Sequence, residues 1–451
     1  MFKKILVANR GEIASRVIRT CKKMNIRTVA VYSEADKEAP FVTEADEAVL
    51  LGGPRVQESY LNTGKILEIA RETNAEAVHP GYGFVSENAD FSRKCEEAGL
   101  TFIGPDPEII SLMGNKVESR IAMEAAGLPL VPGISRPLID VEEAAELAGQ
   151  FGYPVMLKAS AGGGGIGMHA CYSEAELRKA YEGNQKRAQM FFGNGDMFLE
   201  KLIDKPRHIE VQILADQYGS TVYLWERECS IQRRHQKVIE EAPSAFLNQA
   251  DREAMGLAAS TAAKSIGYKN AGTIEFLVDE HKNYYFLEMN TRLQVEHPVT
   301  EEITGLDLVE EQIRIAYGEK LRFAQEDITL SGHSIEARIY AEDPKTMYPS
   351  PGKITSLELP EGVGIRHELG VSGTSTVSPF YDPMIAKLIV SGSTREEAAS
   401  RLKEALAAYK VEGIKTNIPL LSEIAAHEAY LAGDTTTDFI PVHILNNKVS
   451  S

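Results

Sequence analysis

Apolar and polar positions follow two different patterns over the first 110 residues. In the run KILVA (4–8) the four residues after Lys4 are all apolar, as in a buried strand, whereas the apolar residues from Ile13 to Met24 recur at helical spacing. TVAVYS again reads as a strand, and a second helical pattern follows it. Strands that alternate with helices predict a parallel, doubly wound sheet, which binds ligands at the carboxyl ends of its strands. Two loops should lie at such ends, Asn9 to Glu12 and His79 to Phe84.

The pattern changes twice further along the chain. A helix, the strand YPVMLKA, a glycine run and a long polar helix occupy about 115 to 205, and strands dominate from 206 to 300. A third region, 331 to 446, has strands followed by the helix STREEAASRLKEALAAYK. These patterns predict a mixed α/β (α+β) fold in which a doubly wound parallel sheet comes first.

Two strands, AGTIEFLV (271–278) and NYYFLEMN (283–290), are close enough in sequence to form a hairpin. A turn centred between His281 and Lys282 fixes which residues oppose each other. One face is then wholly apolar and belongs to the core, while the other places two carboxylates directly opposite each other. The predicted pairs are Ile274–Met289, Phe276–Leu287 and Val278–Tyr285 on the core face, and Leu277–Phe286, Glu275–Glu288 and Thr273–Asn290 on the other.

Opposed like charges destabilise a sheet unless they share a proton or a cation. Glu275, Glu288 and Asn290 offer only oxygen ligands, which suits Mg²⁺ or Mn²⁺. The alternative is a solvated outer face, which the apolar Leu277 and Phe286 on the same face disfavour. A slip of one residue in the register would undo the pairing.

The polar alternation continues beyond the hairpin in the segment LEMNTRLQVEH (287–297). In an extended chain alternate side chains share a face, so Arg292, Gln294 and Glu296 would continue the face that carries Glu288 and Asn290. The pattern leaves open whether the strand stays extended beyond Asn290.

The glycine run in LKASAGGGGIGMHA (157–170) follows a strand that ends in Lys158. It contains GxGxxG formally, but MHAC after it reads as another strand, whereas the dinucleotide fingerprint opens a helix. Glycine amides can close over phosphates, and a nearby ammonium neutralises them. The alternative is a flexible hairpin or linker. Four consecutive glycines are costly to order, so we expect a lid that a ligand orders.

Two further groups of polar residues remain ambiguous from sequence. His208, Glu210 and Gln212 alternate with apolar residues, which fits a half-buried strand as well as a site. Arg233, Arg234, His235 and Lys237 form a basic cluster, which is either a solvated loop or a site for anions.

Composition narrows the classes of function. The chain has 451 residues, enough for about three domains, and a formal net charge of -17, which argues against non-specific nucleic-acid binding. Its four cysteines are scattered and form no CxxC pair, so neither a disulfide framework nor a zinc knuckle is expected. No apolar run could cross a bilayer, and KILVA is too short for a signal-peptide core. We therefore expect a cytoplasmic protein.

Eight segments of the chain together resemble biotin carboxylase, the ATP-grasp component of biotin-dependent carboxylases. The resemblance covers nearly the whole chain and implies a dimeric enzyme that uses ATP, Mg²⁺ or Mn²⁺ (two ions) and bicarbonate to carboxylate biotin on a carrier protein. It further implies a Rossmann-like domain over 1–114, an ATP-grasp domain over 115–330 with a lid at about 130–205, and a C-terminal domain over 331–446. The segments are ILVANRGEIASRVIR, HPGYGFVSENADF, MGNKVESR, GGGGIGM, RHIEVQ, RECSIQRRHQK, EMNTRLQVEHPVTE and YDPMIAKLIV.

The family's site residues can be carried over to matching positions of this sequence. Tyr82, Gly83 and Arg338 would lie beside biotin, and Glu275, Glu288 and Asn290 would hold metal. Lys237, Arg292, Gln294 and the amide of Val295 would hold bicarbonate, with Glu296 as its general base and with Lys237, Arg292 and Arg338 also catalytic. ATP would be surrounded by Lys116, Lys158, Gly164, Gly165, Glu200, Lys201, Leu202, Ile203, His208, Gln232, His235, Glu275, Leu277 and Glu288.

Three positions depart from the family pattern. Ile166 and His169 stand where the family lid usually carries basic residues, which puts one basic contact of the lid in doubt. Lys23 stands where some bacterial members have an acid thought to pair across the dimer with the equivalent of Arg19, so we expect a weaker dimer or different contacts.

The resemblance also bears on partners. No Met-Lys-Met biotin attachment site occurs in the sequence, so biotin is expected to arrive on a separate carrier protein, with the carboxyltransferase on further chains. The expected role is the first half-reaction of an acyl-CoA carboxylase of the acetyl-CoA carboxylase type, while the sequence leaves open which acyl-CoA, or pyruvate, finally receives the carboxyl group. Two alternatives remain at this point, another ATP-grasp ligase and a catalytically silent nucleotide-binding subunit.

Overall fold

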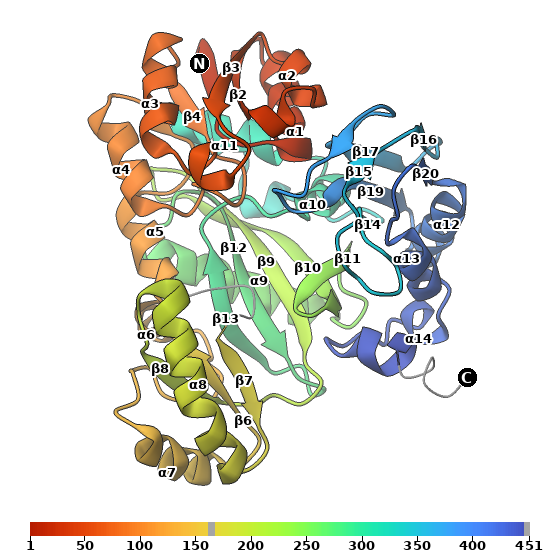
Figure 1. The fold of residues 1–451 in the computed structure, drawn as a ribbon. Coiled ribbons are helices and arrows are strands. Elements are labelled where there is room, and N and C mark those ends of the chain that lie inside the picture. Colours follow the sequence, from red (N-terminus) through yellow and green to blue (C-terminus); the bar gives the residue numbers. More distant parts are fainter. Residues whose placement is uncertain (161–166, 446–451) are drawn as a thin grey trace.

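The computed structural model describes residues 1–160 and 167–445. In the ribbon view, a long antiparallel sheet lies at the centre, with the N-terminal part above it, a small helical and β part below it, and the C-terminal helices beside it (Figure 1). Among the described residues no helix is both long enough and apolar enough to cross a membrane.

The N-terminal part is a five-stranded sheet in the order β3-β2-β1-β4-β5, and every neighbouring pair is parallel, as predicted. The strand order reverses between β1 and β4, where ligand sites of such sheets lie. The two predicted loops meet there, since Asn9 Nδ2 donates to the carbonyls of Pro80 (2.6 Å) and Tyr82 (2.8 Å). The elements are β1 (Lys4–Val7), α1 (Gly11–Lys23), β2 (Arg27–Ser33), α2 (Pro40–Glu44), β3 (Glu47–Gly52), α3 (Thr63–Glu72), β4 (Ala77–His79), α4 (Ala89–Glu97), β5 (Thr101–Phe102) and α5 (Pro107–Gly114).

The lid, here the segment from α7 to β8, is a three-stranded antiparallel sheet covered by two helices. The strand predicted after the glycine run is confirmed as β7, which pairs with β6 so that Met168 opposes Lys158. Leu157, Leu177 and Leu199 belong to an apolar core of the lid's own, separate from the core under the central sheet. The elements from here to the central sheet are α6 (Lys116–Ala125), α7 (Val141–Phe151), β6 (Val155–Ala159), β7 (Met168–Cys171), α8 (Glu174–Phe192) and β8 (Met197–Lys201).

The central sheet has eight strands in the order β13-β12-β9-β10-β11-β14-β19-β17, all antiparallel to their neighbours. It continues past residue 330, because β11 pairs directly with β14. Its first elements are β9 (Arg207–Ala215), β10 (Thr221–Arg233), β11 (Gln236–Ala242), α9 (Gln249–Ser265), β12 (Asn270–Val278), β13 (Tyr284–Asn290), α10 (His297–Thr304) and α11 (Leu308–Tyr317).

The C-terminal part adds three strands to that sheet and packs α12 and α13 over them around a second core that includes Leu388, Leu402 and Leu421. The four cysteines of the chain are all buried and free, as expected from their spacing. The elements are β14 (His333–Tyr340), β15 (Gly352–Lys353), β16 (Ser356–Glu358), β17 (Ile365–Leu369), β18 (Thr376–Val377), β19 (Met384–Gly392), α12 (Arg395–Ala408), β20 (Lys410–Glu412), α13 (Ile418–Ala425) and α14 (Glu428–Leu431).

Candidate active site

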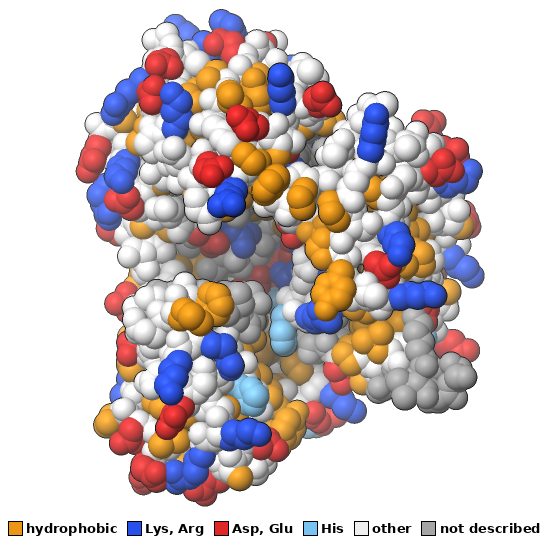
Figure 2. All heavy atoms as spheres, viewed as in Figure 1, with side chains coloured by type: hydrophobic (Ala, Val, Ile, Leu, Met, Phe, Trp, Pro, Cys, Tyr) orange, Lys and Arg blue, Asp and Glu red, His pale blue; other side chains and the backbone are white. Residues whose placement is uncertain are grey.

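A cavity of about 570 Å³ is bordered by the lid, the central sheet and the N-terminal part. Figure 2 shows the molecule hollowed between the lid and the parts above it, with charged and histidine side chains in the hollow. The predicted Gly164 and Gly165 lie outside the described residues, as does Ile166. All other predicted site residues line the cavity, namely Tyr82, Gly83, Lys116, Lys158, Glu200, Lys201, Leu202, Ile203, His208, Gln232, His235, Lys237, Glu275, Leu277, Glu288, Asn290, Arg292, Gln294, Val295, Glu296 and Arg338.

The hairpin of β12 and β13 forms one wall of the cavity. The predicted register is confirmed at three pairs, Thr273–Asn290, Ile274–Met289 and Glu275–Glu288. The three outer pairs were predicted wrongly, because an additional residue, Leu287, is inserted in β13 as a β-bulge. From there the observed pairs are Phe276–Phe286, Leu277–Tyr285 and Val278–Tyr284, and Leu287, not Phe286, faces the cavity.

The two opposed carboxylates of the hairpin have different surroundings. Glu275 accepts hydrogen bonds from Lys237 (3.0 Å), Asn290 (2.9 Å) and Gln294 (2.9 Å). Burial acts to raise the pKa of Glu275, but Lys237 and His208 outweigh it and hold that pKa well below its usual range. Burial and the charge of Glu275 together raise the pKa of Glu288, to which no described residue donates a hydrogen bond. Glu288 is therefore the carboxylate whose oxygens remain available to a ligand.

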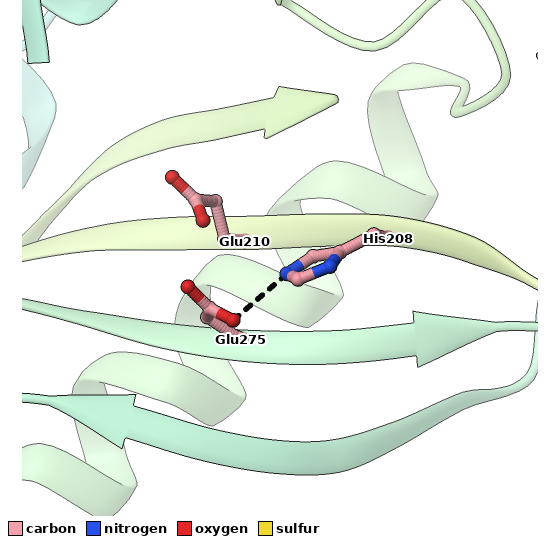
Figure 3. A group of neighbouring side chains, drawn as sticks. All are labelled: His208, Glu210 and Glu275. Carbon is pink, nitrogen blue, oxygen red and sulfur yellow. Dashed lines mark ion pairs between the residues drawn. The ribbon is translucent and has the colours of Figure 1, made fainter. Parts of the chain in front are cut away.

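His208, Glu210 and Glu275 extend from the neighbouring strands β9 and β12 toward one point (Figure 3). The His208 Nε2 atom lies 2.8 Å from a Glu275 oxygen, and its Nδ1 atom lies 2.9 Å from Gln232 Nε2. His208 thus lines the cavity, whereas Glu210 does not line it and reaches the site through Lys237. The third residue of that alternation, Gln212, is fully buried and contacts Arg227 instead.

Lys237 connects this face to the rest of the site. Its ammonium lies 2.6 Å from Glu210, 3.0 Å from Glu275 and 2.7 Å from Glu296. Burial acts to lower the pKa of Lys237, but the three carboxylates outweigh it and raise that pKa well above its usual range. Of the basic cluster predicted around it, Arg233 pairs with Glu342 (2.6 Å) instead, so only part of the cluster serves the cavity.

Glu296 is fully buried and lies between two cations. It accepts hydrogen bonds from Lys237 (2.7 Å) and from Arg338 Nη2 (2.9 Å). Burial acts to raise the pKa of Glu296, but Lys237, Arg338 and Arg227 outweigh it and keep that pKa well below its usual range. Glu296 is therefore ionised at neutral pH, as an acceptor of protons must be.

The segment after Asn290 is not the extended strand that continued alternation would require. β13 ends at Asn290, and the chain then turns before α10 begins at His297. Arg292 nevertheless reaches the cavity, where it donates to Glu87 (2.8 Å), Asn290 (2.9 Å) and Gln294 (2.9 Å). The alternation identified the right side chains, but the turn, not a strand, places the last three of them.

The lid and the segment before it contribute the other end of the cavity. Glu200 pairs with Lys158 from β6 and with Arg120 from α6, and this carboxylate thereby links the lid to the helix that precedes it. Burial lowers the pKa of Lys116, the first residue of α6. Leu202 and Ile203 follow β8 where the chain leaves the lid, so this end combines two lysines with an apolar wall.

Three family descriptions match consecutive parts of the chain. They are the biotin carboxylase N-terminal domain over residues 1–110, the carbamoyl-phosphate synthase L chain ATP-binding domain over 115–324, and the biotin carboxylase C-terminal domain over 336–442. Biotin carboxylase 2 of Bacillus subtilis is 62% identical over 444 residues, which are 98% of this chain and 100% of that protein. The chain belongs to the biotin carboxylase family.

Solved structures of biotin carboxylases share the fold. The biotin carboxylase domain dimer of 2-oxoglutarate carboxylase from Hydrogenobacter thermophilus, in complex with MgADP, ADP and bicarbonate, is 52% identical, with a TM-score of 0.96 over 98% of both chains. The biotin carboxylase of Campylobacter jejuni in a β,γ-ATP complex is 45% identical, with a TM-score of 0.96 over 98% of this chain and 99% of that one. The predicted family, fold class and enzyme class, an ATP-dependent ligase, are confirmed.

In this member of the biotin carboxylase family, the loop after β4 brings Tyr82 and Gly83 to the cavity. The Tyr82 hydroxyl donates to Glu12, and the ammonium of Lys387 lies 6.0 Å from the centre of the Tyr82 ring. Gly81 has a φ of +62°, and a Cβ there would come within 2.9 Å of the Asn9 amide that holds the loop. A side chain at residue 81 would therefore displace the loop.

Sequence reasoning missed several residues that support this biotin carboxylase site. Glu87 pairs with Arg292, and Arg227, which is fully buried, lies 2.6 Å from Glu210. Glu240 lies 2.5 Å from Arg338. Glu87 lies in HPGYGFVSENADF, one of the segments that resemble the family, so the sequence could have indicated it. Glu240, in VIEEA (238–242), looks like any polar residue of an alternating strand.

Proposed function

We propose that the chain carboxylates biotin on a separate carrier protein, using bicarbonate and ATP, through a carboxyphosphate intermediate. ATP-dependent carboxylation with bicarbonate is the activity of its family. The observation that carries the finer proposal is the meeting of Lys237, Glu296 and Arg338 in one cavity with the carboxylates of Glu275 and Glu288.

The first step would use the end of the cavity that binds phosphate. Lys116, Lys158 and His208 would contact ATP between the lid and the central sheet. Glu275, Glu288 and Asn290 fit one or two hard divalent ions, Mg²⁺ or Mn²⁺, because they supply only oxygen ligands and because Glu288 has free oxygens. Such ions would neutralise the charge of the phosphates when bound. Gly164 and Gly165, which lie outside the described residues, belong to the proposed ATP contacts as well.

Bicarbonate would bind where the turn after β13 meets Lys237. Arg292, Gln294 and the amide of Val295 would fix it, and Glu296 would remove its proton so that its oxygen attacks the γ-phosphate. The strongly depressed pKa of Glu296 makes it a weak base at rest. Bound bicarbonate would also interact with the Lys237 ammonium, which would weaken the interaction between Lys237 and Glu296. The pKa of Glu296 would then rise, so Glu296 would be a stronger base at the moment of proton transfer.

The second step would occur between Arg338 and the loop after β4. Carboxyphosphate would break down to CO₂ and phosphate, and the phosphate would take the proton of the biotin ring nitrogen. Arg338 would stabilise the resulting enolate, since a guanidinium keeps its charge and donates two hydrogen bonds in a fixed geometry. The closed lid would exclude water, which would otherwise hydrolyse the intermediate.

The partners belong to the proposal as well. We propose a cytoplasmic homodimer that works with a biotin carrier protein and a carboxyltransferase on other chains, in the first half-reaction of an acyl-CoA carboxylase. Relatives of the chain include one of the pyruvate carboxylase subunits of Methanothermobacter thermautotrophicus, 53% identical, and the small subunit of the 2-oxoglutarate carboxylase of Hydrogenobacter thermophilus, 52% identical. Identification of the proteins that co-purify with the native enzyme would distinguish an acyl-CoA acceptor from a 2-oxo acid.

The test of the activity is an ATPase assay with bicarbonate and free biotin. Turnover should require bicarbonate and should rise with biotin, and carboxybiotin should appear in proportion to ADP. ATP cleavage that ignores biotin would contradict the proposal and favour another ATP-grasp ligase. If Glu296→Ala and Arg338→Ala each changed turnover by less than about tenfold, roughly 1.4 kcal/mol of barrier, the alternative of a silent subunit would gain support.

A further inference from the structure

Two glutamates lie directly opposite each other behind the site, outside the cavity. Glu240 on β11 and Glu336 on β14 are partners in the antiparallel ladder, and neither side chain has any exposed surface. Within the described part of the chain, neither oxygen of Glu336 accepts a hydrogen bond, and Glu240 has Arg338 as its ion-pair partner. Buried polar atoms are nearly always hydrogen-bonded and opposed like charges destabilise a sheet, so this pair needs an explanation.

The pair lies against Arg338. Arg338 Nη2 is 2.5 Å from Glu240 Oε1 and 2.9 Å from Glu296 Oε2, so one nitrogen is shared between two carboxylates on different elements. Arg338 and Glu296 line the cavity, whereas Glu240 and Glu336 do not. Glu240 therefore contacts the guanidinium from the side away from the substrates.

The positive charges around the pair are too few to ionise both acids. Arg338 already forms an ion pair with Glu296. The other nearby cation, Lys387 on β19, donates a hydrogen bond to the carbonyl of Val295 (2.7 Å) and lies 3.2 Å from Glu12. Burial raises the pKa of Glu240 to about 7 and the pKa of Glu336 well above its usual range. The charged and titratable groups that face the pair are Arg338 and Tyr340 on β14, Lys237 on β11, Cys229 on β10, Lys387 on β19 and Glu296 before α10.

We propose that Glu240 and Glu336 together hold one proton, which resides on Glu336, and that the ionised Glu240 is a positioning residue for Arg338. This inference rests on the proposed function, because it assigns the pair a part in the biotin step. With Glu240 ionised, the guanidinium is held between Glu240 and Glu296. With Glu240 neutral, Glu296 is the ionised carboxylate that remains in contact with the guanidinium among the described residues, and a closer pair with Glu296 would draw Arg338 away from the position in which it stabilises the enolate.

The inference predicts an acidic limit to the biotin step. As the pH falls below about 7, Glu240 takes up a proton and releases Arg338, so biotin-dependent turnover should decline. Cleavage of ATP without biotin should decline less over the same range, because it does not require an enolate. The ratio of the two rates therefore reports on Arg338 rather than on the integrity of the fold.

The same neutral substitution at the two partners separates their roles. Glu240→Gln should lower the ratio of biotin-dependent to biotin-independent turnover at least tenfold at pH 8 and should abolish its decline toward pH 6. Glu336→Gln replaces an acid that is already neutral, so it should lower the ratio less than threefold and preserve the decline. Glu240→Asp keeps the charge and should recover part of the loss.

The outcomes are decisive in either direction. If Glu240→Gln keeps the ratio within twofold of the unaltered enzyme and retains its pH dependence, the inference is wrong. It is also wrong if Glu336→Gln is as damaging as Glu240→Gln, because then Glu336 is not the neutral partner. Thermal unfolding and the KM for ATP of each variant identify a variant that merely folds poorly. If the unaltered enzyme has no biotin-dependent turnover, the proposed function itself fails, and this inference fails with it.

Discussion

The ammonium of Lys237 lies 2.7 Å from the Glu296 carboxylate, at the point where β11 approaches the turn that precedes α10. Lys237 also contacts Glu210 and Glu275, so it joins the hairpin that would bind metal to the residue that would act as base. Bicarbonate bound to Lys237, as proposed above, would displace part of that network, because an ammonium group donates only three hydrogen bonds and all three carboxylates already lie within 3.0 Å.

Glu296→Gln should abolish most of the reaction while leaving the fold intact. The amide is isosteric and can still accept from Arg338, but it cannot remove a proton. We expect kcat to fall about 10²- to 10⁴-fold, with the KM for ATP changed less than about threefold. Steady-state ATPase assays with bicarbonate check this. Glu280→Gln, in the exposed turn of the hairpin, is the matched control and should leave kcat unchanged. A similar loss in both variants would contradict the assignment.

Arg338→Lys should separate the two half-steps. Lysine keeps a positive charge but lacks the planar pair of donors, so we expect the biotin-dependent rate to fall at least tenfold while bicarbonate-dependent ATP cleavage persists. Parallel assays with and without free biotin measure both rates. An equal loss in the two assays would mean that Arg338 serves bicarbonate or ATP rather than biotin.

Glu288→Gln should weaken metal binding more than it disturbs the protein, because no described residue donates a hydrogen bond to Glu288. The Mg²⁺ concentration required for half of the maximal rate should rise roughly tenfold or more. Titration of Mg²⁺ at saturating ATP measures this, and Glu280→Gln again supplies the control from the same hairpin. Unchanged Mg²⁺ dependence would exclude Glu288 as a ligand.

Glu241 should make the free energy of unfolding depend on pH in the acidic range. It accepts hydrogen bonds from Arg395 (2.7 and 3.0 Å), and His333 Nε2 lies 2.6 Å away. Burial acts to raise the pKa of Glu241, but His333 and Arg395 outweigh it and lower that pKa to about 2. A carboxyl group whose pKa is lower in the folded than in the unfolded protein stabilises the fold fully at a pH above its pKa in the unfolded chain. For Glu241 this stabilisation is about 3 kcal/mol, and it should be lost as the pH falls from about 4.5 toward about 2.

The variant Glu241→Gln, compared with the unaltered protein, tests this assignment. It should be less stable at pH 7 by about 3–5 kcal/mol, because Arg395 then lacks its anionic partner. Its free energy of unfolding should also depend less on pH between 5 and 3 than that of the unaltered protein. Urea unfolding at several pH values measures both effects. Parallel curves for the two proteins would show that Glu241 does not cause the dependence.

The hairpin illustrates how far the sequence predicts the site. Alternation and the turn position placed Glu275 opposite Glu288, but not Phe276 opposite Phe286. The difference is one inserted residue, Leu287, and a bulge leaves no turn residue or break in apolarity that would mark it. The sequence pattern therefore predicted the charged end of the hairpin correctly and misassigned its apolar end, where Leu277 and Leu287 line the cavity.

Contacts between distant segments were beyond prediction from pattern. Thr291 and Arg292 leave the extended conformation where they meet Glu87, more than two hundred residues earlier in the chain. Glu240 and Glu336 likewise belong to strands whose pairing no local signal specifies. Each strand alone reads as an ordinary alternation, and only the register of β11 with β14 brings the two acids together.

The pairing of β11 with β14 limits how members of this family can be recombined. Arg338 and Glu275 lie on strands of one hydrogen-bonded sheet, which fixes the separation between these two ends of the cavity. A chimera that joins residues 1–330 of this chain to the remainder of a relative would place a foreign β14 beside Glu240. Such hybrids should tolerate exchange of the lid better than exchange of the C-terminal part, because the lid has an apolar core of its own, whereas the C-terminal part joins the rest of the chain through a buried strand pairing.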